Sequence, residues 1–302
     1  MIGVADSVEL AVLVRDGEIE SRHLGAAVLL DADGSILDSL GDPAALIYPR
    51  SAVKPLQATA VLGTGLVLEG EELVLASASH AGTPAHVAVV ERILSAAGLD
   101  EHALQCPMDW PVDPGARSAT TIPRRITMTC SGKHAAFLAA SVHAGWTTAD
   151  YLDPGHPLQR AIATTIADYA GEAVSHWGID GCLAPTPVIS LAGLARAFGR
   201  LAASDSPLPS AILANPWAID GPGRENAVTI EQTGLIAKIG AEGVLILATT
   251  DGQAVAVKTL DGASRARTMV GLELFVRAGI VPREQADAVL AATLEPGLRV
   301  AF

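Results

Sequence analysis

The sequence predicts an α+β fold in which strands from both ends of the chain form one antiparallel sheet with helices packed on it. Two observations predict it. Segments with strand character cluster near the two ends of the chain, and segments with helical periodicity lie between them. The chain has 302 residues, half of them hydrophobic, which is enough for a large core. There is no abrupt shift in composition and no long charge run, so we expect a single domain, residues 1–302.

Three strands and a helix are predicted at the start of the chain. The strands are expected at residues 8–14, 24–31 and 35–39, the last after the turn Asp-Ala-Asp-Gly, and the helix at 54–65. Pro55 restricts the start of that helix, because proline fits only the first turn, where its missing N–H has no partner in any case. Ser51 is therefore expected at or just before the start of the helix.

The rest of the chain is predicted to be helical up to a final group of strands. Helices are expected near 84–98, 134–145, 155–171 and 190–203, and irregular surface segments at 109–124 and 203–210. Residues 235–262 read as three strands joined by glycine-containing turns, and helices at 264–279 and 283–293 close the chain. Pairing the N-terminal strands with these C-terminal strands gives one sheet with helices on its faces.

The charge of the chain argues against nucleic acid as a partner. The net charge is −13, and no stripe of Lys and Arg is present that could bind phosphate groups. No apolar run is long enough to span a bilayer without charges. The first residues lack the basic start and the cleavage site of a secretory signal, so we expect a cytoplasmic protein with no membrane contact.

Lysine is scarce, which draws attention to the lysines that remain. The chain has sixteen arginines but only four lysines, Lys54, Lys133, Lys238 and Lys258. Arginine stays protonated, whereas a buried lysine can lose its proton and act as a base. Lys54 follows Ser51 by three residues, so the two share one face of a helix start. There the helix dipole favours a serine alkoxide and a neutral lysine, although an N-cap serine followed by a surface lysine gives the same pattern.

Two further segments and a loop offer polar side chains to a site. Small residues at 76–82 let the backbone approach a ligand, and Ser79 and His80 supply a hydroxyl and an imidazole there; the alternative is a capped helix end. Lys238 interrupts an apolar strand, so it either snorkels from a sheet edge or faces a cleft. A glycine-containing loop ends at Arg224, which could bind a carboxylate through two hydrogen bonds or lie free on the surface.

The cysteines argue against a disulfide framework. There are three, an odd number, and two of them lie in motifs with other metal-binding side chains. Cys130, Asp180 and Cys182 could together hold a soft divalent ion such as zinc. Their spacing is not a standard zinc pattern, and two buried cysteines with a turn aspartate would also explain it. Cys106 reads as a small buried hydrophobic residue.

Taken in order, these motifs resemble the rhizobial-type L-asparaginases, the L-asparaginase II family. The resemblance covers most of the chain and is carried by R-S-x-x-K-P-x-Q-A at 50–58, A-S-H at 78–80, C-S-G-K-H at 130–134, D-G-C-x-x-P at 180–185 and K-x-G-A at 238–241. It implies a fold similar to the serine β-lactamases, a family that also uses Ser-x-x-Lys. It also implies that a homodimer hydrolyses L-asparagine to L-aspartate and ammonia.

The resemblance assigns catalytic roles to two serine–lysine pairs. It implies that Ser51 and Lys54 form the first pair and that Ser79 and Lys238 form the second. We expect Lys54 to take the proton of the nucleophile Ser51, and Ser79 to deliver a proton to the departing ammonia. Two lysines near one site repel, and each should lower the pKa of the other.

The resemblance also implies a zinc site and a set of substrate contacts. The zinc, which organises the pocket, is expected on Cys130, Lys133 and Cys182, with Asp180 beside them. The expected substrate contacts are Arg50, His80, His134 and Arg224. A lysine ligand must lose its proton to bind a metal, so metal affinity should fall at low pH.

One segment departs from the family pattern. After Gly223-Arg224 the family usually has an aromatic residue and then a small hydroxyl or thiol residue, whereas this chain has Glu225-Asn226. That loop lines the substrate side and leaves alternatives open. They are hydrolysis of glutamine, hydrolysis of another amide by a β-lactamase-like enzyme, and ligand binding without catalysis. Asparagine and glutamine differ by one methylene, which is worth only about 1–3 kcal/mol.

Overall fold

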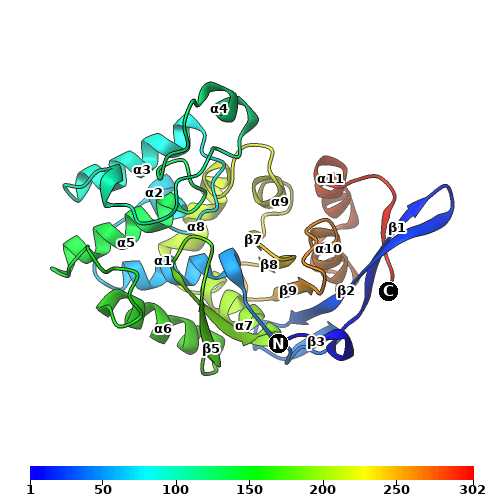
Figure 1. Ribbon diagram of the computed structural model, residues 1–302. Coiled ribbons are helices and arrows are strands. Elements are labelled where there is room, and N and C mark those ends of the chain that lie inside the picture. Colours follow the sequence, from blue (N-terminus) through cyan, green and yellow to red (C-terminus); the bar gives the residue numbers. More distant parts are fainter.

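A seven-stranded antiparallel sheet is built from both ends of the chain, as predicted (Figure 1). In the computed structural model, which describes residues 1–302, the strand order is β10-β1-β2-β9-β8-β7, with β3 paired to β2. The strands of this sheet are β1 Val8–Arg15, β2 Glu18–Leu30, β3 Ile36–Leu40, β7 Ile236–Gly240, β8 Val244–Ala248, β9 Ala254–Thr259 and β10 Leu298–Val300.

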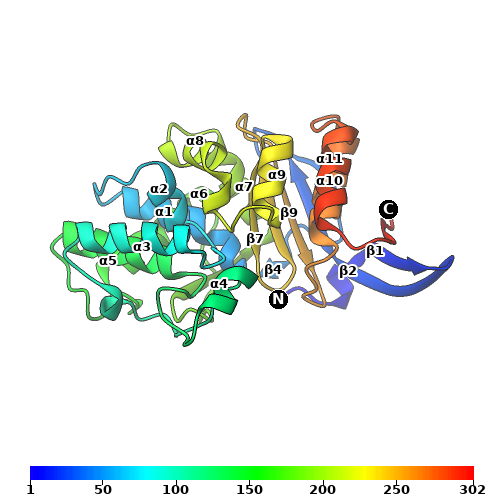
Figure 2. The same ribbon diagram turned by 90° about the horizontal axis from the view of Figure 1, so that it is seen from above.

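The helices divide into those that cover the sheet and those that form a separate group beside it. The helix α7 packs on one face of the sheet and α10 on the other, while α1 to α6 and α8 gather beyond the β7 edge (Figures 1 and 2). The helices are α1 Lys54–Leu62, α2 Gly70–Ala76, α3 Pro84–Ala96, α4 Pro114–Ala119, α5 Ser131–His143, α6 Pro157–Ala170, α7 Leu191–Ala202, α8 Pro207–Ala214, α9 Glu225–Thr233, α10 Arg267–Arg277 and α11 Arg283–Thr293. No helix is both long and apolar enough to cross a membrane.

The edge strand β7 brings the sheet against the helical group. It pairs only with β8, so its second edge faces the short 3₁₀ helix η2 (Arg50–Val53) that leads into α1. Gly240 permits this approach, because a Cβ atom there would lie 2.7 Å from the carbonyl oxygen of Pro49. The segment that carries Ser51 therefore packs directly on the end of the strand that carries Lys238.

A second, smaller sheet positions the cysteine motif. It has the order β4-β6-β5, formed by β4 Leu46–Ile47, β5 His176–Ile179 and β6 Pro185–Ser190. The turn between β5 and β6 contains Asp180 and Cys182, and it is closed by the hydrogen bond from the N–H of Asp180 to the carbonyl of Ala184 (2.9 Å).

Several element boundaries differ from those predicted. The segment predicted as a surface loop at 203–210 contains the start of α8, because Ser206 caps the helix through the N–H of Leu208 and Pro207 occupies its first position. The predicted irregular segment 109–124 likewise contains α4, capped by Asp113. The helix expected at 54–65 ends earlier, at Leu62. The short elements α2, α9, β4 to β6 and β10 were not predicted.

Candidate active site

Ser79 lies between two lysine side chains where the helical group meets the sheet. It follows α2, and its N–H donates to the carbonyl of Ile219 (2.9 Å), which fixes its backbone. The Nζ of Lys54 lies 2.9 Å from the Ser79 Oγ, and the Nζ of Lys238 lies 3.0 Å from the same atom. Ser79 is only half-buried, so its hydroxyl has two amine partners while the residue remains partly open to solvent.

Lys54 begins α1, and its amine has three acceptors. Besides Ser79, it donates to the carbonyl of Ala78 (2.6 Å) and to the Sγ of Cys130 (3.2 Å). An ammonium group has three N–H bonds, so these contacts use all of them. Ser51 lies in η2, and its hydroxyl makes no hydrogen bond with the rest of the chain. The predicted contact between Ser51 and Lys54 is therefore not formed.

Burial sets the protonation of the second lysine. Lys238 is fully buried on β7, and its amine also donates to the carbonyl of Ile239 (2.8 Å). Burial, followed by the positive charge of Lys54, lowers the pKa of Lys238 well below the usual lysine value. Lys238 is therefore the amine that can be neutral and accept a proton from Ser79.

Arg50 precedes Ser51 and is held by Asp180. Its φ is +52°, a conformation that residues other than glycine rarely adopt. Two guanidinium nitrogens of Arg50 each lie 2.8 Å from the Oδ1 of Asp180, and the N–H of Gly181 donates to the same oxygen (2.8 Å). Burial raises the pKa of the Asp180 carboxyl group. The positive charge of Arg50 outweighs this and keeps the pKa of Asp180 below the usual value. The carboxylate is thus engaged with Arg50, and it forms no hydrogen bond to the predicted zinc ligands.

Two thiols and an amine form a buried cluster beside Lys54. The Nζ of Lys133 lies 3.1 Å from the Sγ of Cys182. The side chains of Cys130 and Cys182 influence each other strongly, and this interaction lowers the pKa of Cys182 to about 4 and raises that of Cys130 to about 12. Burial disfavours a charged amine at Lys133, yet the neighbouring sulfur atoms of Cys182 and Cys130 raise its pKa. The cluster therefore contains one thiolate next to one thiol and one ammonium group.

The donor atoms of this cluster fit zinc. Sulfur and nitrogen ligands suit a soft divalent ion, and Cys130, Lys133 and Cys182 are all buried. No three His, Cys, Asp or Glu side chains converge in the structure, so a metal at this place needs Lys133 as its third protein ligand. Zinc binding here stays a prediction.

His80 and His134, which were predicted to contact the substrate, are fully buried. The Nε2 of His80 lies 2.9 Å from the Oγ of Ser131, and its Nδ1 accepts from the N–H of Gly82 (3.1 Å). The Nδ1 of His134 lies 2.7 Å from the hydroxyl of Tyr151. Burial lowers the pKa of both imidazoles well below the usual value, so they are neutral. In this structure they connect segments of the helical group and are not open to a substrate.

Arg224 and Asp220 flank the start of α9. Arg224 forms no ion pair, and its buried Nε has no partner, so this guanidinium is available to a carboxylate. Asp220 is buried and accepts from the N–H groups of Asn226 (2.8 Å) and Ala227 (3.3 Å); burial raises its pKa to about 6. Asp220 was not predicted, although an aspartate placed before a helix is a usual partner of free helical N–H groups.

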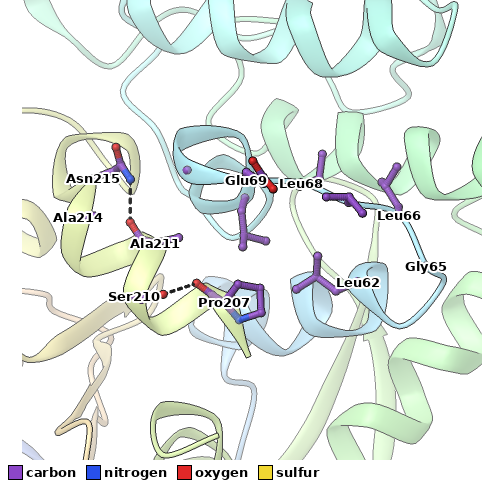
Figure 3. A pocket seen from close by; sticks show the side chains of 13 residues that line it. Leu62, Gly65, Leu66, Leu68, Glu69, Pro207, Ser210, Ala211, Ala214 and Asn215 are labelled. Atoms are coloured by element: carbon purple, nitrogen blue, oxygen red, sulfur yellow. Dashed lines mark hydrogen bonds between the residues drawn. The ribbon is translucent and has the colours of Figure 1, made fainter. Parts of the chain in front are cut away.

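A large groove lies elsewhere in the structure. It has a volume of about 650 Å³ and runs between α8 and the segment that joins α1 to α2 (Figure 3). Its walls are mainly apolar, and they include Leu62, Leu66, Leu68, Pro207 and Ala211. Glu69 is its one charged residue, and none of the serine or lysine side chains described above lines it. This groove is therefore separate from the serine and lysine side chains around Ser79.

Three comparisons relate the chain to known proteins. The sequence model of the family described as L-asparaginase II matches residues 11–300. No curated protein sequence matches the chain. Among solved structures, the chain is similar to a β-lactamase (Mb2281c) from Mycobacterium bovis, with a TM-score of 0.45 and 16% identity, over 88% of this chain and 94% of that chain. It is also similar to Mglu in its native form, with a TM-score of 0.43 and 13% identity, over 84% of this chain and 64% of that chain.

Proposed function

The chain belongs to the L-asparaginase II family, and from this premise we propose that it hydrolyses the side-chain amide of L-asparagine to give L-aspartate and ammonia. The family makes it an asparaginase-type amidohydrolase. The observation that supports the proposal most directly is the Ser79 hydroxyl within hydrogen-bond distance of two buried lysine amines, one of which has a strongly lowered pKa. A serine next to a neutral amine is an activated nucleophile.

The contacts favour Ser79 as the attacking serine. Neutral Lys238 accepts the Ser79 proton, and the Ser79 oxygen attacks the side-chain amide carbon. The amide nitrogen then leaves as ammonia, taking a proton from Lys238 or Lys54, and water hydrolyses the resulting ester by the same transfers in reverse. This makes Ser79 the nucleophile in place of Ser51 and assigns the delivery of the proton to a lysine in place of Ser79. Ser51 stays the alternative nucleophile, since its carbonyl accepts from the backbone N–H of Lys54 but its hydroxyl bonds to neither lysine amine.

Two arginines are suited to bind the substrate carboxylate. Arg224 has no ion-pair partner, and Arg50 is fixed by Asp180 next to Ser51. Zinc, when bound by Cys130, Lys133 and Cys182, would supply a fixed positive charge beside Lys54, whose amine contacts Cys130. The homodimer implied by the resemblance stays a prediction.

The proposal is tested by ammonia release from L-asparagine and L-glutamine. We expect release from asparagine by the native protein, and a loss of roughly 10³-fold or more in kcat for Ser79→Ala, because no other hydroxyl contacts the lysines. Ser210→Ala is the matched control, since Ser210 is an exposed serine in α8 that bonds only to the carbonyl of Pro207.

The outcomes separate the alternatives. If Ser51→Ala abolishes release while Ser79→Ala retains most of it, Ser51 is the nucleophile and the assignment of Ser79 is wrong. Release mainly from glutamine would keep the amidohydrolase and change the substrate. No release from either amide, with or without added zinc, would refute the proposed activity.

A further inference from the structure

Asn226, one of the two residues that depart from the family pattern, is buried against the free edge of β7. Its side chain is 1% exposed, and its Oδ1 accepts from the N–H of Ile239 (2.8 Å). Because β7 has no neighbouring strand on this side, the Ile239 N–H would otherwise lack a partner, which is costly for a buried amide. Asn226 thus supplies the hydrogen bond that a further strand would have made.

The peptide unit that Asn226 holds is adjacent to the reacting groups. The carbonyl of Ile239 accepts from the Nζ of Lys238 (2.8 Å), and the same Nζ lies 3.0 Å from the Oγ of Ser79. Asn226 fixes the N–H side of Ile239, and Lys238 uses its carbonyl side as an anchor. A displacement of Ile239 would therefore move one of the two groups that hold the Lys238 amine in place.

The neighbouring residue Glu225 holds the same strand at a second point. Its carboxylate pairs with Arg267, whose Nη2 lies 2.6 Å from the Oε2, and another nitrogen of Arg267 donates to the carbonyl of Gly240 (2.8 Å). Asp220 in turn accepts from the N–H of Asn226 and fixes the first turn of α9. Both residues that depart from the family pattern therefore connect the start of α9 to the last two residues of β7.

We propose that Asn226 is a positioning residue that keeps the amine of Lys238 in contact with Ser79 by holding the Ile239 peptide. This inference rests on the proposed function. Asn226 does not touch the reacting atoms, and it acts through the backbone of β7. The buried hydrogen bond between the Ile239 N–H and the Asn226 Oδ1 keeps the free edge of β7 ordered next to Ser79.

The first test measures the structural half of the inference and needs no substrate. Amide hydrogen exchange is followed by NMR in the native protein, in Asn226→Ala and in Gln159→Ala. Gln159 is a matched control, because it is a buried amide side chain with one hydrogen bond to a backbone carbonyl, that of Tyr151 (2.8 Å). We expect the Ile239 N–H to exchange at least about tenfold faster in Asn226→Ala only, with the amides of β8 unchanged. Unchanged exchange at Ile239 would overturn the proposal.

The second test measures the catalytic half. We expect Asn226→Ala to lower kcat for L-asparagine roughly 10- to 100-fold, as for a displaced catalytic group, with KM changed less than about threefold. In a protein that already carries Lys238→Met, adding Asn226→Ala should lower kcat no further, because the two residues act through one amine. The proposal would be overturned if Asn226→Ala lowered kcat by the same factor with and without Lys238→Met. It would also be overturned if Gln159→Ala lowered kcat as much as Asn226→Ala does.

A replacement variant covers the case in which Asn226→Ala does not fold. Asn226→Ser retains a polar group, but its hydroxyl is one bond too short to take the place of Oδ1, so it should give the same faster exchange and the same fall in kcat. Native exchange at Ile239 together with native kcat in Asn226→Ser would overturn the inference. If the native protein releases no ammonia, the proposed function fails, while the exchange test still decides whether Asn226 holds the strand.

Discussion

Two buried ammonium groups beside one hydroxyl would repel each other and would both lose their hydration. The site avoids this because Lys238 is fully buried on β7, where burial and the charge of Lys54 lower its pKa. Lys54 instead has three acceptors arranged around its amine. The pair is therefore unequal, with one amine suited to be a base and the other suited to donate hydrogen bonds.

This asymmetry predicts how the rate depends on pH. If neutral Lys238 is the base, kcat/KM for L-asparagine should rise with pH as Lys238 loses its proton, with a midpoint well below the usual lysine pKa. The direction follows from the lowered pKa, since the active form is the deprotonated one above that value. Initial rates between pH 5 and the alkaline limit of folding measure it. A midpoint at the ordinary lysine value would contradict the role of Lys238.

The lysines, and the pairing of Lys238 with Ser79, were predicted through the family resemblance, but the contact between Lys54 and Ser79 was not. In a chain with so few lysines, the motifs around Lys54 and Lys238 single them out, and the structure buries both. Spacing alone favours a contact between Lys54 and Ser51, three residues apart. The acceptors that Lys54 uses, at Ala78 and Ser79, are 24 and 25 residues away, and only the packing of α1 against the end of α2 brings them together.

At the scale of elements, the site depends on a close approach between β7 and η2. Gly240 ends the strand, and a side chain there would meet the carbonyl oxygen of Pro49 at 2.7 Å and the backbone nitrogen of Ala52 at 3.2 Å. Backbone atoms cannot move aside as the end of a flexible side chain can. The distance between the segment carrying Ser51 and the strand carrying Lys238 is thus set by the absence of a Cβ atom.

Gly240→Ala should therefore separate the two elements. We expect it to destabilise the protein by about 1–3 kcal/mol, as overpacking does, and to lower kcat together with stability. Thermal unfolding and ammonia release measure the two effects. Gly3→Ala is the control, because a Cβ there would meet its nearest neighbour, the Oδ2 of Asp6, at an ordinary distance of 3.6 Å. Equal unfolding temperatures for the two variants would show that β7 and η2 are not in tight contact.

The long, periodic elements were the ones that the sequence predicted best. The strands at both ends and the helices α3, α6 and α7 have clear periodicity, and the antiparallel pairing followed from their order along the chain. The short helices α8 and α9 were not predicted, each for its own reason. Proline and serine at the start of α8 resemble a loop, and α9 is only a few turns long and lies next to a glycine-containing turn. Asn226 belongs to α9, so its contact with β7 could not be predicted.

At the scale of the whole molecule, the site collects residues from distant parts of the chain. Ser79 and Lys54 come from the helical group, Lys238 from the C-terminal strands, and Cys182 from the small sheet. Only the packing of all three parts creates the cluster. The cluster of Cys130, Lys133 and Cys182 joins the turn of the small sheet to the start of α5, so any ion bound there would link these two parts.

Zinc should therefore stabilise the whole fold, and it should do so only when the ligands can lose their protons. The pKa of Cys130 is raised to about 12 and that of Lys133 is also raised, so both must release a proton on binding, whereas Cys182 with a pKa of about 4 is already a thiolate. We expect a higher unfolding temperature with zinc at pH 8, a smaller increase at pH 6, and about two protons released per ion by calorimetry in buffers of different ionisation enthalpy.

Cys182→Ser should lose the zinc-dependent increase in unfolding temperature, while Cys106→Ser, which replaces a buried thiol outside the cluster, should retain it. An increase that is the same at both pH values, or that survives in Cys182→Ser, would show that zinc binds at another place.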